Sequence, residues 1–206
     1  MLSTQPRAVA GKTSRVVLVH GIFQSGRMFA PLVRRLEAEG CECLVPKLTP
    51  ADARQGIEPL AEQLKTAIDQ RWGDTGKVHI VAHSMGGLIS RVYLQHLGGH
   101  ERCQSLTTLA TPHHGTLAAW FYPGKGAMQM RRGSAFLKDL ETTGHRLRGI
   151  ALRSYYTPMD LIILPYTSSQ WEIAENQTVR APAHPLVLFA PRVVRYLLQL
   201  TRVQAP

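Results

Sequence analysis

Short apolar runs alternate with segments that place apolar residues at helical spacing along the first half of the chain. Four runs have the length and the polar or proline boundaries typical of buried strands, and they cover residues 15–20, 41–48, 78–82 and 105–110. The segments with helical periodicity cover residues 26–40, 57–72 and 88–97. Because strands that are apolar on both faces alternate with helices, the pattern predicts an α/β fold, a parallel sheet with helices on both faces.

The alternation lapses in residues 116–150, which hold large apolar side chains among several glycines. Such a segment above the strand ends predicts a short cap-like insertion over an apolar pocket, and ordinary helical packing on the sheet is an equal alternative. The regular pattern then resumes with two strands and a closing helix, expected at residues 153–157, 177–181 and 185–201. Pro191 falls early in that helix, where it would kink or restart it.

One serine stands where a predicted strand turns directly into a predicted helix, in the sequence AHSMGG at 82–87. A turn of this kind is the sequence form of a nucleophile elbow. The strained serine backbone requires small residues two positions away on either side, and Ala82 and Gly86 meet that requirement. We therefore predict that Ser84 is a nucleophile. His83 leaves the turn in another direction, and we expect it to line the pocket or to have a structural role.

A serine hydroxyl is a poor nucleophile unless a histidine takes its proton and an acid orients that histidine. Behind a serine elbow the chain order is serine, acid, histidine. His184 follows the last predicted strand and precedes the closing helix, and Asp160 is the only aspartate after Asp139. We predict His184 as the base and Asp160 as the orienting acid, with Glu172 and Glu175 as the alternative acids.

The tetrahedral intermediate of such a reaction needs two N–H donors for its oxyanion. One is the N–H of Met85, the residue after the nucleophile. The other comes from the turn after the first strand, where we predict Ile22 and keep Phe23 as the alternative. The residues expected to contact the substrate are Phe23, His83, Trp120 and Phe121.

Composition and charge narrow the remaining possibilities. The chain has 206 residues with 44% apolar content, which fits a single globular domain over residues 1–206. It carries a net charge of +10 without a basic run interleaved with aromatic residues, so we expect no nucleic-acid partner. The basic surface is either simply solvated or weakly attracted to anionic membrane surfaces.

Nothing in the sequence suggests export, a metal or a cofactor. It shows no apolar stretch of signal-peptide length near the N-terminus and no apolar run long enough to span a bilayer. Its three cysteines form no disulfide framework. These features favour the cytoplasm. His113 and His114 lack further ligands at a diagnostic spacing, so we expect neither a metal nor a cofactor.

The motifs taken together resemble a known family. They are VLVHGIF at 17–23, AHSMGG at 82–87, TPHHGT at 111–116, MD-x-I at 159–162 and AHPLVLFAPRVV at 183–194. In this order they resemble the α/β-hydrolase superfamily and, within it, small bacterial lipases and esterases. The resemblance implies a minimal hydrolase sheet of about six mostly parallel strands. It also implies hydrolysis of small-molecule carboxylic esters of lipophilic acyl groups through an acyl-enzyme on Ser84.

The sequence departs from that family in two ways and leaves the reaction class open. Those lipases are commonly secreted, and their final histidine usually follows a glycine-rich turn, whereas His184 lies between Ala183 and Pro185. A thioesterase or an amidase would use the same residues. A hydrolase fold kept as a non-catalytic binding module is the other alternative, and it would predict a broken triad. The oligomeric state has no signature in the sequence.

Overall fold

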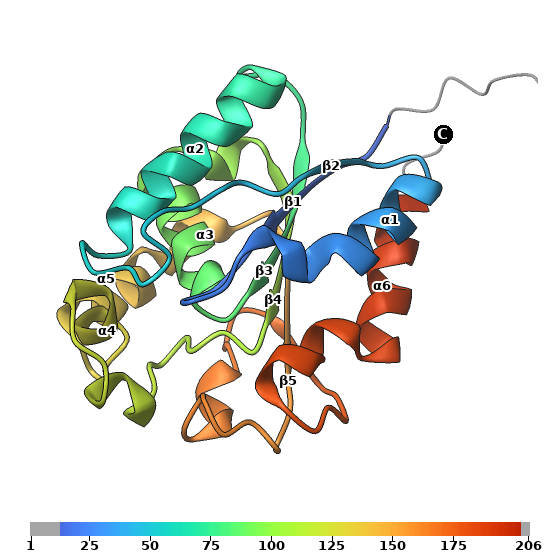
Figure 1. The fold of residues 1–206 in the computed structure, drawn as a ribbon. Helices are drawn as coiled ribbons and strands as arrows, with labels where there is room; N and C mark the ends of the chain where they lie inside the picture. The colour runs from blue at the N-terminus through green and yellow to red at the C-terminus, as the bar shows by residue number, and fades with distance from the viewer. Residues whose placement is uncertain (1–12, 203–206) are drawn as a thin grey trace, which may run out of the picture.

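A computed structural model describes residues 13–202 of the chain, and its centre is one six-stranded sheet (Figure 1). The strands are β1 (Arg15–Val19), β2 (Glu42–Leu44), β3 (Val78–His83), β4 (Cys103–Leu109), β5 (Ala151–Tyr156) and β6 (Glu175–Thr178). Their order across the sheet is β2-β1-β3-β4-β5-β6, and every neighbouring pair is parallel. The predicted α/β fold with a six-stranded parallel sheet is therefore confirmed.

Helices cover both faces of this sheet, as predicted. In Figure 1, α1 (Ala30–Ala38) and α6 (Pro191–Arg202) lie on one side, and α2 (Glu58–Trp72) and α3 (Met85–His96) lie on the other. Strand β1 serves both layers, because successive side chains point to opposite faces. Its Val16 and Leu18 belong to the core cluster under α1 and α6, and Val17 and Val19 belong to the cluster under α2 and α3.

Several element ends differ from the predicted ones: β6 ends at Thr178 instead of residue 181, and two other differences occur at prolines. Strand β2 ends at Leu44 instead of continuing to residue 48, and Pro46, which has no N–H to donate, follows two residues later. The closing helix is split, because the short 3-10 helix η6 (His184–Phe189) precedes α6, which begins at Pro191. Proline is favoured in the first turn of a helix, so the restart expected there is the outcome.

The segment 116–150 contains two parts with different packing. Its later part, with α5 (Ala135–Thr142) and η4 (Thr143–Leu147), buries Leu137 and Leu140 in the core cluster beside α3. Its earlier part contains η3 (Leu117–Trp120) and α4 (Lys125–Gln129). The hydrogen bonds that hold helix α4 include one from the Gly126 N–H to the Ala53 carbonyl (3.0 Å) and one from the Ile57 N–H to Gln129 Oε1 (2.8 Å).

The remaining 3-10 helices are short connections, η1 (Gly26–Phe29), η2 (Gly99–Glu101) and η5 (Tyr166–Ser169). Within residues 13–202, none of the helices has both the length and the apolar content that crossing a bilayer requires. Residues 1–12, which form most of the stretch behind the expectation about a signal peptide, lie outside the described residues.

Candidate active site

Ser84 occupies a strained turn between β3 and α3. Its φ of 56° and ψ of −129° lie in a region that residues other than glycine rarely adopt. A Cβ atom on Gly86 would lie 2.3 Å from the Val19 carbonyl oxygen, and one on Gly87 would lie 2.1 Å from Thr111 Oγ1. The two glycines thus let α3 begin in close contact with the ends of β1 and β4.

Strand β4 fixes the same turn by hydrogen bonds. The Ser84 N–H donates to the Leu109 carbonyl (2.8 Å), and the Thr111 hydroxyl donates to the Ser84 carbonyl (2.9 Å). Both backbone polar groups of Ser84 are therefore engaged, and the residue is only 4% exposed.

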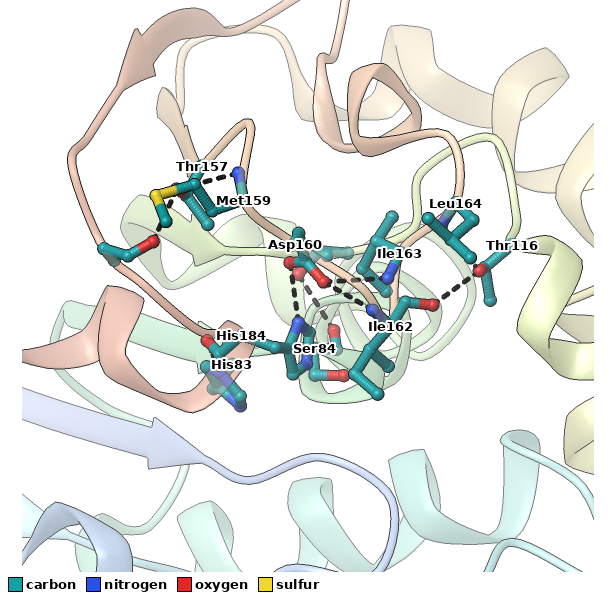
Figure 2. Close-up of polar contacts among 12 residues, drawn as sticks. His83, Ser84, Thr116, Thr157, Met159, Asp160, Ile162, Ile163, Leu164 and His184 are labelled. Carbon is teal, nitrogen blue, oxygen red and sulfur yellow. Dashed lines mark hydrogen bonds and ion pairs between the residues drawn. The ribbon is translucent and has the colours of Figure 1, made fainter.

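Asp160 and His184 meet in the loops that follow β5 and β6, as Figure 2 shows. His184 Nδ1 and Asp160 Oδ2 are 2.8 Å apart, and both residues are buried. The other carboxylate oxygen, Oδ1, accepts the N–H groups of Ile162 and Ile163, each at 2.9 Å. An ionised carboxylate only accepts hydrogen bonds, so Nδ1 of neutral His184 carries the proton and Nε2 keeps a lone pair. The His184 ring lies 4.8 Å from that of His83, the residue before Ser84, measured between ring centroids.

The surroundings of Asp160 favour its charged form. Burial of the carboxyl group opposes ionisation, but the hydrogen bond and charge of His184 and the two backbone N–H donors outweigh it and lower the pKa of Asp160 below its usual 3.8. Thr116, at the start of the segment that leads to η3, supports this loop, because its hydroxyl donates to the Ile162 carbonyl (2.7 Å). The carboxylate is thus ionised at neutral pH and held in one orientation toward His184.

Two N–H groups next to Ser84 remain available for an anion. Within residues 13–202, neither the Met85 N–H at the start of α3 nor the Ile22 N–H after β1 donates a hydrogen bond. The Phe23 N–H, the alternative donor, is already bonded to the Ala51 carbonyl at 2.9 Å. This difference favours Ile22 over Phe23 as the second donor.

Exposed aromatic residues lie in the turn after β1 and in the segment that follows β4. Phe23 is 61% exposed, Trp120 59% and Phe121 85%. The Phe23 ring contacts that of Tyr122, with centroids 5.5 Å apart. We refer to Phe23, Trp120, Phe121 and Tyr122 as the rim. The rim continues toward the acid loop, because the Leu117 N–H donates to the Leu164 carbonyl (2.9 Å), and Leu164 is itself partly exposed.

His83 does not belong to the rim, although it was expected among the substrate contacts. It is fully buried, with Nδ1 3.0 Å from Gln24 Oε1 and Nε2 3.2 Å from the His184 carbonyl oxygen. Burial and the neighbouring His184 lower the pKa of His83 to about 3, so it stays neutral at physiological pH. Of the two roles considered for it, the geometry favours the structural one. Sequence reasoning missed Gln24, which stands in a loop without periodicity.

The alternative acids lie elsewhere. Glu175 is in β6 and forms an ion pair with Arg153, and Glu172 lies 3.0 Å from His114. Neither contacts His184 in the structure. Over residues 13–202, no group of histidine, cysteine and acidic side chains is arranged to hold a metal ion. His113 is instead buried, with its ring stacked 4.3 Å from that of Trp171.

A family model described as the alpha/beta hydrolase fold matches residues 14–199. The chain belongs to this family. Among solved structures, the mature form of Bacillus licheniformis lipase BlEst2 covers all of the chain with a TM-score of 0.71 at 16% identity, over 96% of its own length. Aspergillus fumigatus lipase B covers 94% of the chain with a TM-score of 0.74 at 15% identity, over 54% of its own length. Likenesses at these identities establish the fold alone.

Curated relatives of this hydrolase chain have names from two reaction classes. A triacylglycerol lipase of Burkholderia plantarii is 32% identical over 134 residues, which are 58% of the chain and 37% of the relative. The lysosomal thioesterase PPT2 of Mus musculus is 26% identical over 132 residues, 60% of the chain and 43% of the relative. The matches thus span less than half of each relative. They support a hydrolase of the ester and thioester class at family level.

Proposed function

We propose that the protein hydrolyses small-molecule carboxylic esters of lipophilic acyl groups through an acyl-enzyme on Ser84. The observation that carries this proposal is the 2.8 Å contact of His184 with Asp160, in loops that come together beside the strained serine turn. That contact leaves the lone pair on His184 Nε2, which can then act as the base for Ser84. A binding module would not need an ionised carboxylate to fix the tautomer of a histidine there.

The steps follow from these groups. His184 Nε2 takes the proton of the Ser84 hydroxyl as Oγ attacks the carbonyl carbon of the ester. The carbonyl oxygen becomes an anion, which the N–H groups of Met85 and Ile22 stabilise. The tetrahedral intermediate collapses, and His184 gives its proton to the departing alcohol. Water then attacks the acyl-enzyme by the same route in reverse, releasing the acid and restoring Ser84.

The rim supports the choice of lipophilic substrates. Its aromatic side chains are exposed near the end of the strand that leads to Ser84. An acyl chain that contacts them would remove apolar surface from water, which is favourable. A thioester is the second candidate substrate, because a relative named as a thioesterase is among the curated matches. The same nucleophile, base and donors would serve either reaction.

The test uses a fluorophosphonate probe, which labels activated serines. We expect the wild-type protein to be labelled and Ser84→Ala to lose labelling completely. Ser90→Ala is the matched control, because Ser90 lies in α3, the helix that begins directly after Ser84, and its hydroxyl is occupied as a donor to the Gly86 carbonyl (2.8 Å). We expect this variant to be labelled normally. A series of p-nitrophenyl esters and acyl thioesters then ranks the substrates. A folded wild-type protein that neither labels nor hydrolyses any of them, with or without detergent, would contradict the proposal.

A further inference from the structure

The turn that carries Ile22 is closed by one side chain, that of Gln24. The Gly21 N–H donates to Gln24 Oε1 (2.9 Å), and the Gln24 N–H returns a longer bond to the Gly21 carbonyl (3.4 Å). The first bond fixes the orientation of the side-chain amide, because an N–H donor must face its oxygen and not its NH2 group. Gln24 therefore presents Oε1 toward the site, with a second acceptor position still open.

His83 fills that second position from the elbow strand. Its Nδ1 lies 3.0 Å from Gln24 Oε1, and its Nε2 lies 3.2 Å from the His184 carbonyl oxygen. Both neighbours are acceptors, and a neutral imidazole has one N–H to give. We assign the proton to Nδ1 because that contact is the shorter of the two, and Nε2 then faces the His184 carbonyl oxygen without a hydrogen bond. This tautomer donates to Gln24.

We propose that the Gln24 side chain is a positioning residue that clamps the Ile22 turn to the elbow through the Nδ1–H of His83. Oε1 then accepts from Gly21, which precedes Ile22, and from His83, which precedes Ser84. The clamp thus spans the backbone on both sides of the site where the oxyanion would form. This inference rests on the proposed function and assigns a role to two residues outside the triad.

The turn and the elbow are close enough for a small shift to matter. A Cβ atom on Gly21 would lie 2.7 Å from the Ser84 Cβ, so the two segments are already in contact. Without the clamp, the turn would depend mainly on the bond of the Phe23 N–H to the Ala51 carbonyl. Catalytic groups that move by about 1 Å typically lose about 100-fold in rate, so a loosened turn should affect turnover more than substrate binding.

The experiment compares Gln24→Met, which keeps the side-chain length but removes the acceptor, with Gln95→Met. Gln95 is a buried glutamine near the C-terminal end of α3. Its Oε1 accepts from Arg91 Nε (3.0 Å), and its Nε2 donates to the Leu140 carbonyl (2.6 Å) and the Thr143 hydroxyl (2.8 Å). We expect Gln24→Met to lower kcat about 10- to 100-fold with KM nearly unchanged. Gln95→Met should lower the melting temperature at least as much while keeping kcat. Equal losses of kcat in the two variants would overturn the proposal.

Two substitutions of His83 distinguish the roles of its two ring nitrogens. Asparagine places an amide N–H near the position of Nδ1, and glutamine places one near that of Nε2. We expect His83→Asn to retain most of the turnover, and His83→Gln to lose about as much as Gln24→Met. The double variant Gln24→Met/His83→Gln should lose no more than Gln24→Met alone, because Gln24→Met already removes the bond that His83→Gln removes. Losses that multiply would show that the two residues act separately.

A readout that needs no activity distinguishes failure of this proposal from failure of the proposed function. Hydrogen exchange of the Gly21 amide reports the bond to Gln24 directly. We expect exchange to accelerate at least tenfold in Gln24→Met and not in Gln95→Met. If the wild-type protein is inactive but this pattern holds, the clamp exists without the proposed catalysis. Unchanged Gly21 exchange in Gln24→Met would overturn the clamp, whatever the activity.

Discussion

The carboxyl edge of the sheet and the rim around it are built in opposite ways. At the edge, Ser84, Asp160 and His184 are each at most 6% exposed, and their backbone or side-chain partners are fixed by hydrogen bonds. In the rim, Phe121 is 85% exposed and projects from the loop between η3 and α4. One region is closely packed and polar, and the other is open and apolar.

The difference indicates how the work of the site is divided. A reaction that develops charge needs donors and acceptors already in place, since groups that must reorganise give up most of their electrostatic effect. Recognition of an apolar chain needs area and no fixed geometry, so exposed aromatic side chains suffice. Substitutions at the edge should therefore change the rate of chemistry, whereas substitutions in the rim should change substrate preference.

Asp160→Asn should have the largest effect. The amide keeps the shape of the carboxylate but no longer fixes the His184 tautomer or stabilises its protonated form, and a loss of about 10⁴-fold in kcat is typical of that change. Steady-state hydrolysis of a p-nitrophenyl ester measures it. Asp139→Asn is the matched control, because Asp139 also contacts a histidine, His96 Nε2 at 2.8 Å, but on an exposed surface. Similar activities of the two variants would argue against Asp160 as the acid.

Phe121→Ser should have an intermediate effect, confined to long acyl chains. Burying an aromatic side chain is worth about 1.5–3 kcal/mol, so partial contact predicts a rise in KM of roughly tenfold for long-chain esters. Acetate esters should show no change, and neither should the melting temperature. Ile173→Ser is the control, because Ile173 is 51% exposed but does not belong to the rim. A uniform loss over all chain lengths would place Phe121 in the machinery of the edge.

The smallest effect is the contribution of His83 to the pH dependence of stability. The pKa of His83 in the folded protein is lowered from 6.5 to about 3, mainly by burial, so the unfolded chain binds more protons between these pH values. Stability should therefore fall as the pH drops below 6.5. His83→Gln should remove about 1 kcal/mol of the loss between pH 7 and pH 5.5. Urea unfolding at both pH values measures it, and an unchanged pH dependence in the variant would mean that protons reach His83.

The elbow and the chain order of the three site residues could be predicted from the sequence because their constraints are local. Small residues must flank Ser84, and polar residues must follow strands that end at one edge. The role of Gln24 could not be predicted, because its side chain bonds both to its own turn and to His83, which lies 59 residues further along the chain. The packing of residues 116–150 was ambiguous for a similar reason, since burial of Leu137 and exposure of Phe121 depend on tertiary context.

Two predictions concern where the protein acts in the cell. Contact with an anionic membrane and a cytoplasmic location remain predictions from charge and composition. The rim gives the first of these a place to be tested, because the Arg131 guanidinium lies over the Trp120 ring at 4.2 Å. Aromatic and arginine side chains together are typical of surfaces that meet a lipid headgroup region.

Residues 51–54 connect the turn that carries Ile22 with helix α4, two segments that a protein engineer would prefer to vary separately. The Ala51 carbonyl accepts the N–H of Phe23, the residue after Ile22, and the Ala53 carbonyl accepts the Gly126 N–H of α4. A library that varies residues 120–122 leaves both attachments intact and should retune acyl preference at constant turnover. Deletion of residues 120–129 would remove Gly126 and with it the hydrogen bond to the Ala53 carbonyl. The modular boundary for redesign therefore lies between Tyr122 and Lys125.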